Sequence, residues 1–444
     1  MKTLKIITLA FCLLIQGIAF SQDNKLQVIK EKYDATLKGQ NKGVAILVKK
    51  DNRTHTASIG NFNLTAHSVF NIGSATKTFT AILLMQEVEK GTIKLTDSIG
   101  TYLTPIKNVD GSLSIQALMT HESGIAEVIG RNIEETFYAK SDSLYTVQLL
   151  NHVSENDPEM VGKYNYCNTN YFLLGKIIEK ITDQSYFDLL RERIFIPLKM
   201  DKTYPYVYKN ISNLATPYHE EKDVTEYLDY RYFANIAYAA GSIASTLTDM
   251  EKFYTTLFET DVLLQKETVK TMMNAGNEFY GLGIMKSESD GVKYYGHGGN
   301  NIGYAFRNSH DPISKDLFLI FSNTKNIPLK ATLKKDVFSV LTGKEINKAL
   351  GGISAKNMKR FAGKYLLKEA NLTFEIIKEG NKLFLSVEAQ GIKSLLTQTN
   401  ETTLTDSTVG ATIEYLEGEE DLLKFSQNGY ETKLHRINSD EPSK

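Results

Sequence analysis

One stretch dominates the sequence, Phe70-Asn-Ile-Gly-Ser-Ala-Thr-Lys-Thr-Phe-Thr80, which opens a long amphipathic run that reaches Lys90. Its core is Ser74-Ala-Thr-Lys77, and positions three apart share one face of a helix. A serine hydroxyl becomes nucleophilic when a neighbouring base takes its proton, and a lysine of lowered pKa is such a base. Free N–H groups at a helix start also favour a developing oxyanion. The stretch therefore predicts a nucleophilic serine at the start of a helix.

The motif alone does not identify a catalytic serine, because Ser-x-x-Lys is a short pattern. The chain contains a second match, Ser322-Asn-Thr-Lys325. Such a motif is a hypothesis until its structural context is known. The rest of the chain has to supply that context.

The N-terminus has the features of a secretory signal peptide. Met1-Lys-Thr-Leu-Lys5 is basic, Ile6 to Phe20 is nearly all apolar, and Ala19-Phe-Ser21 offers a cleavage site before Gln22. We therefore expect residues 1–21 to be removed and the protein to be exported, either periplasmic or secreted. The 444-residue chain is also long enough for more than one domain, since single cores rarely exceed ~250–300 residues.

Charge and cysteine content narrow the partners of the mature chain. Without residues 1–21, which include Lys2 and Lys5 but no acid, 49 basic residues face 52 acidic ones. This balance argues against binding to nucleic acid or through a polybasic membrane patch. Cys12 lies in the signal peptide, so Cys167 has no partner for an internal disulfide. No later run has the ~18 apolar residues of a membrane span, so we expect no transmembrane anchor in the mature chain.

The hydrophobic pattern predicts an α+β domain over residues 22–350. Strands are expected at 43–50 and 54–60, mainly helices follow from residue 74 to about 258, and strands return at 280–286, 292–297, 303–309 and 317–322. A short helix is expected from Ile115 to Gly124, where the glycine would end it, and another helix from 329 to 341. Strands at both ends predict one antiparallel sheet with flanking helices and an inserted helical subdomain.

A second, smaller unit is expected at 356–440. After Phe361-Ala-Gly-Lys-Tyr365, short alternating runs are separated by turns rich in Gly, Asn and Glu; they lie at 372–377, 382–387, 402–406, 411–416 and 422–425. This pattern is typical of a small all-β barrel or sandwich. No cluster of residues in it suggests catalysis, so we interpret it as an accessory domain.

Two further motifs suit an acyl-transfer site. Tyr166-Cys-Asn168 offers a phenol for proton transfer and an amide for holding substrate, although Tyr208-Lys-Asn210 has the same spacing in a lysine-rich setting. His297-Gly-Gly-Asn-Asn-Ile-Gly303 follows a predicted strand, where glycines let the backbone approach a substrate. A lone histidine is more often structural than functional, but the flanking glycines leave this one little side-chain cover.

Ser74-Ala-Thr-Lys77, Tyr166-Cys-Asn168 and His297-Gly-Gly299, in this order, resemble the three motifs of the serine β-lactamase-related superfamily. The branch is the one with class C β-lactamases, D-alanyl-D-alanine carboxypeptidases and related esterases. Three further segments also resemble recurring family segments: Leu118-Met-Thr-His-Glu-Ser-Gly124, Ala240-Gly-Ser-Ile-Ala-Ser245 and Tyr280-Gly-Leu-Gly283. The resemblance covers about residues 25–345.

The resemblance implies a β-lactamase/transpeptidase-like fold and a role for each motif residue. Ser74 is the expected acylated nucleophile, Lys77 takes or relays its proton, and Tyr166 is the general base and proton shuttle. The expected substrate-binding residues are Asn168, His297, Gly299 and Asn300, with the backbone N–H groups of Ser74 and Asn300 forming the oxyanion hole. No metal or other cofactor is expected.

Departures from the family pattern bear on the substrate. His297 stands where class C β-lactamases have lysine, which favours peptides, D-amino-acid amides or esters over β-lactams. The alternatives are a β-lactamase and a low-turnover protein that binds penicillin or peptidoglycan. The expected partner is thus a small molecule or a peptide, with cell-wall peptide among the candidates. Cys167 is interpreted as a small buried residue, His121 and Glu122 as structural, and Glu127 receives no role.

Overall fold

The structure is a computed structural model. It describes residues 25–34, 37, 41–60, 64–128, 149–219, 221–289, 291–325, 327, 330–346, 353, 355–380, 382–398, 402–406, 409–419, 421–427 and 430–437. The predicted signal peptide, residues 1–21, lies outside these ranges. Among the residues described, no helix has both the length and the apolar character needed to cross a membrane.

Contacts within the chain define two compact units. One comprises Gly39–Lys325, and the other combines Met1–Lys38 with Asn326–Lys444. The domain limits expected from the sequence, 22–350 and 356–440, stay predictions, because a grouping of contacts does not test which segments fold alone.

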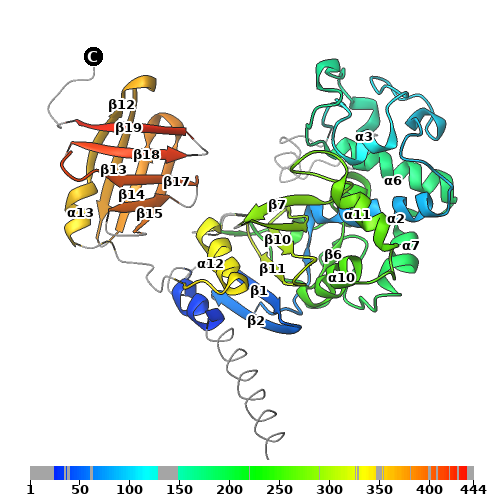
Figure 1. Cartoon of the computed structure of the whole chain (residues 1–444), viewed down its shortest axis with the longest axis horizontal. Helices are drawn as coiled ribbons and strands as arrows, with labels where there is room; N and C mark the ends of the chain where they lie inside the picture. The colour runs from blue at the N-terminus through cyan, green and yellow to red at the C-terminus, as the bar shows by residue number, and fades with distance from the viewer. Residues whose placement is uncertain are drawn as a thin grey trace, which may run out of the picture. The chain divides into compact units, whose positions relative to one another are not determined.

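The first unit is built on an antiparallel sheet with the order β2-β1-β11-β10-β8-β7, in which β9 also pairs with β10 (Figure 1). The first and last strands meet as predicted, since β1 aligns with β11 from Val44↔Ser322 to Lys49↔Leu317. Nearly every residue of β1 and β11 is buried, which is typical of strands covered on both faces. The strands are β1 (Gly43–Lys50), β2 (Arg53–Gly60), β7 (Met285–Ser289), β8 (Val292–Gly296), β9 (Gly299–Asn301), β10 (Tyr304–His310) and β11 (Leu317–Ser322).

Helices and short strands occupy the chain between β2 and β7. The helices are α2 (Thr76–Glu89), α3 (Ile115–Met119), α6 (Asn168–Thr182), α7 (Tyr186–Leu190), α8 (Tyr230–Tyr232), α9 (Tyr238–Gly241), α10 (Leu247–Glu259) and α11 (Lys266–Asn274). The short strands pair as β3 (Phe70–Asn71) with β6 (Ala244–Ser245), and β4 (Tyr218–His219) with β5 (Lys222–Asp223). Helix α10 packs against β1 and β11, whereas α2 packs against α6, α7 and α9.

Helix α2 differs from the amphipathic helix that the sequence suggested. All residues from Thr76 to Met85 are buried, so this helix is enclosed on every side. Its threonines make this possible by bonding neighbouring carbonyls: Thr78 Oγ1 donates to Gly283 O at 2.7 Å, and Thr80 Oγ1 donates to Ala239 O at 2.7 Å. The helix is therefore the centre of the unit, and the residues at its start are held by that core.

Two other predicted boundaries were displaced by tight turns. The strand expected at 280–286 begins at Met285, because Gly283 has φ +72° and the Gly281 N–H donates to Ile284 O at 2.8 Å. The helix expected to stop at Gly124 ends at Met119, since His121 adopts φ +59°. In both cases the apolar pattern continued through a change of backbone direction.

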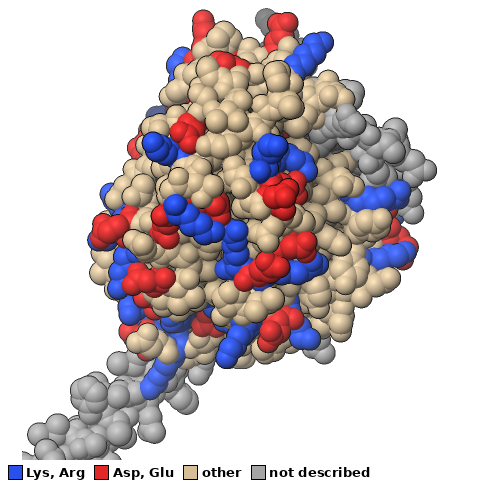
Figure 2. Space-filling model, turned by 90° about the vertical axis from the view of Figure 1, so that its right-hand side faces the viewer, with Lys and Arg blue, Asp and Glu red and all other residues tan. Residues whose placement is uncertain are grey.

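One face of the molecule carries charges of both signs. On the face shown in Figure 2, lysine and arginine residues are interspersed with aspartate and glutamate. This mixture agrees with the near-neutral composition of the chain.

The second unit contains a closed antiparallel barrel, which decides between the barrel and the sandwich expected from the sequence. Residues 25–34 of this unit are helical, and there Lys32 Nζ and the Tyr33 hydroxyl each donate to Asp336 at 2.7 Å. Strands β15 and β19 were not expected. The elements are α12 (Lys330–Thr342), α13 (Ala355–Phe361), β12 (Gly363–Leu367), β13 (Leu372–Glu379), β14 (Lys382–Val387), β15 (Ile392–Gln398), β16 (Thr403–Asp406), β17 (Ala411–Tyr415), β18 (Leu422–Gln427) and β19 (Tyr430–Ile437).

Candidate active site

Ser74 lies in a 3₁₀ turn, Gly73–Ala75, that leads directly into α2. The turn needs a glycine, because Gly73 has φ +54°. The buried side chain of Asn71 links this turn to α9: its Oδ1 accepts the Gly73 N–H at 2.9 Å, and its Nδ2 donates to Gly241 O at 3.1 Å. The hydroxyl of Ser74 is thus presented at the start of a rigid helix, as the sequence predicted.

Lys77 is fully buried one turn further along. Its Nζ donates to Ser74 Oγ at 3.2 Å, to Asn168 Oδ1 at 2.7 Å and to Ala240 O at 2.8 Å. Burial lowers the pKa of this amine from 10.5 to about 7, and the negative charge of Glu127 opposes that shift. A lysine in this position exists partly as a neutral amine at neutral pH, which is the form that accepts a proton.

Tyr166 stands over the same amine, with its ring centroid 5.0 Å from Lys77 Nζ. Burial raises the pKa of its phenol above the ordinary value of 10.0, while a hydrogen bond with Ser74 opposes the increase. The phenol is therefore neutral at neutral pH and has a proton to give. Asn168, two residues later, is the first residue of α6.

A segment that precedes this motif in sequence holds it in place. Nearly every residue from Asn165 to Asn170 bonds the segment 121–128, which we term the bracket. Cys167 N donates to His121 Nδ1 at 3.1 Å, Asn168 N donates to Glu127 Oε2 at 2.7 Å, and Ser123 Oγ donates to Asn170 Oδ1 at 2.7 Å. The bracket explains how a loop keeps a fixed position beside α2.

Cys167 fits the interpretation of a small buried residue. Its side chain is buried, and burial raises the pKa of the thiol to about 11. A thiol of raised pKa is a poor nucleophile, since the thiolate is the reactive form.

His297 follows β8 and lies inside the site with 1% of its surface exposed. Its Nδ1 contacts Gly298 O at 2.7 Å, so Nδ1 must carry the proton, and its Nε2 accepts from the Tyr280 hydroxyl at 2.8 Å. Burial and the charge of Lys77 lower the pKa of His297 to about 3. In this arrangement the ring is neutral, with both nitrogens engaged by the chain itself. Its centroid is 6.3 Å from that of Tyr166.

The glycines after His297 let β9 run directly against the nucleophile's turn. A Cβ on Gly299 would lie 2.0 Å from Ile72 O and 2.6 Å from Ser74 N, and one on Gly73 would lie 2.9 Å from Asn300 N. Arg307 supports this strand from behind, because its Nη1 donates to Gly299 O at 3.1 Å. The backbones of Ser74 and Asn300 are therefore neighbours, as an oxyanion hole requires.

A cavity of about 100 Å³ opens beside the nucleophile. Its lining includes Ser74 and the expected substrate-binding residues Asn168 and Asn300. Asn301, which was not expected, also lines it, together with Ala240 and Gly241 of α9. All seven residues expected from the sequence thus lie around one place, although their roles stay predictions.

The second copy of each short motif lies in a different setting. Ser322 is the last residue of strand β11, where positions three apart do not share a face, and its hydroxyl donates to Thr324 O at 2.8 Å. Lys325 therefore does not repeat the arrangement of Lys77. Tyr208-Lys-Asn210 lies outside the lining of the cavity beside Ser74.

Sequence reasoning missed Glu127, Tyr280 and the carbonyl of Ala240. Glu127 is an exposed acid in a helix-free segment and carries no distinctive signal by itself. Tyr280 and Ala240 belong to segments that resemble recurring family segments, but nothing in those segments indicates which atom contacts the site.

Comparison with known proteins identifies relatives that span most of the chain. A family model described as "Beta-lactamase" matches residues 26–337. Penicillin-binding protein 4* of Bacillus subtilis (strain 168) is 24% identical over 82% of this chain and 86% of its own length. The teichoic acid D-alanine hydrolase of Staphylococcus aureus is 26% identical over 49% of this chain, which spans only 52% of that relative.

A solved structure gives the same picture. The D-stereospecific amidohydrolase from a Streptomyces species superimposes with a TM-score of 0.60 and 25% sequence identity over 72% of this chain and 99% of its own. The fold and the motifs therefore lead to one family.

Proposed function

The chain belongs to the beta-lactamase family, and from that membership and the geometry around Ser74 we propose that it is a serine hydrolase that works through an acyl-enzyme. The observation that carries the proposal is the buried Lys77 amine, 3.2 Å from Ser74 Oγ and with its pKa lowered to about 7. A base whose pKa lies near the working pH is well suited to take a proton.

The proposed reaction has two steps. In the first, Ser74 Oγ attacks the substrate carbonyl carbon while its proton passes to Lys77 Nζ, and the backbone N–H groups of Ser74 and Asn300 stabilise the oxyanion. The bond to the leaving amine or alcohol breaks as that group receives a proton through Tyr166. In the second, water attacks the ester carbonyl, the acid leaves, and Ser74 regains its proton.

We assign proton acceptance to Lys77 and proton delivery to Tyr166. Burial moves the two pKa values apart, downwards for the amine and upwards for the phenol. Groups whose environments separate their pKa values in this way suit opposite roles in acid–base chemistry. The general-base role expected for Tyr166 from family resemblance is thus better matched by Lys77, with Tyr166 as the shuttle.

The proposed substrates are peptides, D-amino-acid amides or esters. Relatives described as a teichoic acid D-alanine hydrolase and a D-stereospecific amidohydrolase support this class. The small cavity beside Ser74 suits a compact substituent next to the reacting carbonyl. We further propose that the protein acts after export, on the basis of the N-terminal sequence.

A second candidate is a penicillin-binding protein with little turnover. It is favoured by the likeness to penicillin-binding protein 4*, which extends over 82% of this chain. Such a protein would form the same ester on Ser74 but release it slowly, so the two candidates differ in the second step only.

Intact-mass analysis tests the proposal. Wild-type protein is incubated with a fluorophosphonate or with benzylpenicillin, and the expected result is one covalent adduct that peptide mapping assigns to Ser74. The Ser74→Ala variant should remain unmodified. The serine assignment fails if both probes leave the wild type unlabelled, or if Ser74→Ala is labelled equally.

Turnover separates the two candidate functions. A panel of p-nitrophenyl acetate, a D-amino-acid amide, a D-alanyl-D-alanine peptide and nitrocefin is assayed with the wild type. Steady hydrolysis of an amide, peptide or ester supports the hydrolase. Stoichiometric labelling without turnover supports the penicillin-binding protein, and rapid nitrocefin hydrolysis supports a β-lactamase.

A further inference from the structure

Glu127 joins the bracket to the site at a single residue. One carboxylate oxygen, Oε2, accepts two hydrogen bonds from Asn168, from its backbone N at 2.7 Å and from its side-chain Nδ2 at 2.9 Å. The same Asn168 side chain presents its other end, Oδ1, to Lys77 Nζ at 2.7 Å. Glu127 is therefore one residue removed from the amine that contacts the nucleophile.

The chemistry of the carboxylate determines which way the Asn168 amide points. An amide has a donor end and an acceptor end, whereas an ionised carboxylate only accepts. Opposite a carboxylate, the amide must present its NH2 group, so its oxygen has to face Lys77. A group that both donates and accepts, such as a glutamine amide, imposes no such choice.

The orientation of Asn168 in turn aims the lone pair of Lys77. A neutral amine has two hydrogens and one lone pair, and its Nζ lies within bonding distance of three oxygens. Asn168 Oδ1 and Ala240 O have no hydrogen to donate here, so they take the two N–H groups. The lone pair is then left for Ser74, the one neighbour with a proton to give. If the Asn168 amide were reversed, its NH2 would compete for that lone pair.

We propose that Glu127 is a positioning residue, which holds the Asn168 amide in the one orientation that directs the Lys77 lone pair at Ser74. This inference rests on the proposed function, because it presumes that Ser74 is acylated with Lys77 as the proton acceptor. It adds a residue that neither the three motifs nor the comparisons assign.

Glu127 also acts on Lys77 through its charge. The amine is faced by titratable groups from α6 and its preceding loop, from the bracket and from the strand end at His297. They are Tyr166, Cys167, Tyr171, His121, His297 and Glu127. Burial dominates the pKa of Lys77, and the Glu127 charge is the largest influence that opposes it. Removing this negative charge lowers the pKa of Lys77 further, so the neutral amine persists to lower pH.

The test is the pH dependence of kcat/KM for p-nitrophenyl acetate, between pH 5 and 9. This ester is uncharged, so no charge attraction between substrate and carboxylate enters the result. In the wild type, kcat/KM should rise with pH as Lys77 loses its proton. In Glu127→Gln the plateau should fall by about 10- to 100-fold, as misplaced reacting groups cost in other enzymes. The midpoint of the rise should also move to lower pH.

Two further variants serve as controls for the effect of Glu127→Gln. Glu122→Gln removes a charge from the same bracket, where the carboxylate accepts from Thr120 Oγ1 rather than from Asn168, and should match the wild type in both plateau and midpoint. Glu127→Asp keeps the charge but shortens the reach, so it should lower the plateau and leave the midpoint near that of the wild type. It also serves if Glu127→Gln does not fold, as judged by thermal unfolding.

The outcomes separate this inference from the proposed function. If the wild type neither hydrolyses the ester nor is labelled at Ser74, the proposed function is wrong and this inference falls with it. If the wild type reacts and Glu127→Gln matches Glu122→Gln in plateau and midpoint, the positioning role alone is wrong. A lowered plateau with an unmoved midpoint in Glu127→Gln also contradicts it, because a purely structural loss would have that effect.

Discussion

Lys77 is a fully buried residue with an ionisable side chain, and the groups packed around its amine leave little room for the larger side chain of an arginine. Its amine donates to Ser74, Asn168 and Ala240, while the rings of Tyr166 and Tyr171 lie over it with centroids at 5.0 and 5.6 Å. A primary amine can give up its proton in such a place, whereas a guanidinium stays protonated.

We therefore expect Lys77→Arg to lower kcat/KM for p-nitrophenyl acetate by at least about 100-fold, the usual contribution of a general base. In the wild type, kcat/KM should rise with pH to a plateau. The midpoint of the rise should lie near pH 7, because burial lowers the pKa of Lys77 to about 7 and the neutral amine is the active form. Stopped-flow or steady-state assays across pH 5–9 measure both effects.

The chain provides its own control for this change. Lys325→Arg alters the lysine of the other Ser-x-x-Lys sequence, which follows strand β11, and should leave kcat/KM and its pH profile unchanged. A wild-type profile that is flat between pH 5 and 9 would contradict the role of Lys77.

The sequence could predict site residues whose side chains are typical of acyl-transfer chemistry. It could not predict residues that reach the site only through a hydrogen bond to another side chain. Ser74, Lys77 and Asn168 were predicted as site residues because a hydroxyl, an amine and an amide occur at the spacings of known motifs, and in the structure the three side chains are hydrogen-bonded together. Glu127 was not predicted because the role proposed for it depends on which end of a neighbouring amide it faces. His297 was predicted as a site residue, which stays a prediction; its partner Tyr280 was not, because only the folded chain brings the two side chains to 2.8 Å.

At the scale of elements, the close approach of β9 to the turn before α2 sets the geometry of the site. Antiparallel pairing of β9 with β10 fixes the strand from one side, with Gly299 opposite Phe306. On the other side only a hydrogen atom separates Gly299 from the backbone of Ile72 and Ser74. The strand and the turn therefore cannot move closer, and any side chain at this position must drive them apart.

Gly299→Ala should consequently disable the site without unfolding the protein. Its methyl group would lie 2.0 Å from Ile72 O, closer than real contacts allow, so β9 has to shift away from Ser74. We expect kcat/KM for p-nitrophenyl acetate to fall by about 100-fold, as for other displacements near 1 Å. Gly111→Ala is the matched control, since its Cβ would meet nothing nearer than 3.5 Å. Equal activity of the two variants would show that the contact does not control the site.

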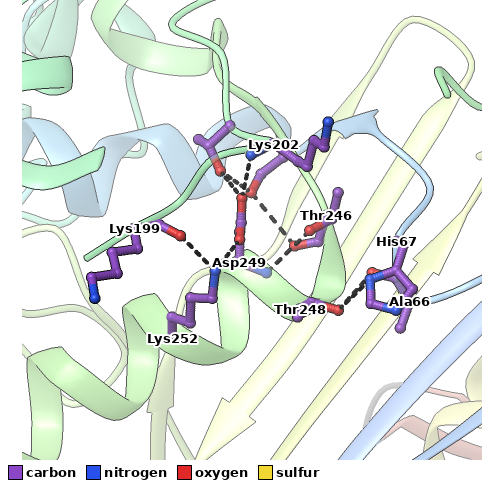
Figure 3. A network of polar contacts seen from close by, with 10 residues as sticks. Ala66, His67, Lys199, Lys202, Thr246, Thr248, Asp249 and Lys252 are labelled. Atoms are coloured by element: carbon purple, nitrogen blue, oxygen red, sulfur yellow. Dashed lines mark hydrogen bonds and ion pairs between the residues drawn. The ribbon is translucent and has the colours of Figure 1, made fainter. Parts of the chain in front are cut away.

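A second element, α10, is anchored by the buried side chain of Asp249 near its start (Figure 3). Asp249 Oδ2 accepts from Lys202 N at 2.9 Å and from Thr203 Oγ1 at 3.0 Å, and its Oδ1 accepts from Lys252 Nζ at 2.8 Å. Thr246 caps the helix, with its Oγ1 accepting the Asp249 N–H at 3.1 Å. One carboxylate thus joins α10 to the segment around Lys202 and Thr203, which lies between α7 and β4 in the sequence.

Asp249→Asn should lower the free energy of unfolding by about 1–3 kcal/mol, because an NH2 group would face a donor whichever way the amide is turned. The midpoint of urea unfolding measures the change. Asp188→Asn is the comparison, since its pair with Arg191 is exposed and its loss should cost no more than about 0.5 kcal/mol. Similar midpoints for the two variants would mean that the Asp249 contacts are dispensable.

Elements with a regular apolar period were predicted more accurately than those that begin or end in turns. β1 and β11 agree with the predicted ranges, because burial on both faces leaves a nearly continuous apolar run. The strand expected at 280–286 was misplaced because Tyr280, Leu282 and Ile284 alternate with other residues as in a strand. All three are buried, but they lie in a tight turn. Periodicity reports burial, and only the backbone shows how that burial is achieved.

At the scale of the whole molecule, the two units have separate hydrophobic cores. The core of the first unit extends from Ala45 to Phe321, and a second core runs from Ile353 to Leu434 inside and beside the barrel. Every residue assigned to the reaction lies in the first unit. Stability of the barrel and competence of the site should therefore respond to different substitutions.

Leu423→Ala tests this separation, because Leu423 is fully buried in β18. Truncation of a buried leucine costs about 2–5 kcal/mol, so the calorimetric transition of the barrel unit should move to lower temperature. The kcat/KM for p-nitrophenyl acetate should not change at temperatures below that transition. Lys424→Ala, which removes a charge at the surface of the same strand, is the control for β18. Equal loss of activity and barrel stability would contradict two independent cores.

The buried Lys77 also has a consequence for selection. Because burial lowers the pKa of its amine from 10.5 to about 7, the unfolded chain binds a proton that the folded chain does not over that interval. The free energy of unfolding should accordingly rise with pH between about 7 and 10.5, and below 7 the protein bears the full cost of an enclosed charge. A library screened for heat resistance in mild acid should thus enrich replacements of Lys77 by apolar residues. In such a screen, substitutions of Lys77 would give variants that are both the most heat-resistant and the least active. Thermal stability and turnover therefore have to be selected together.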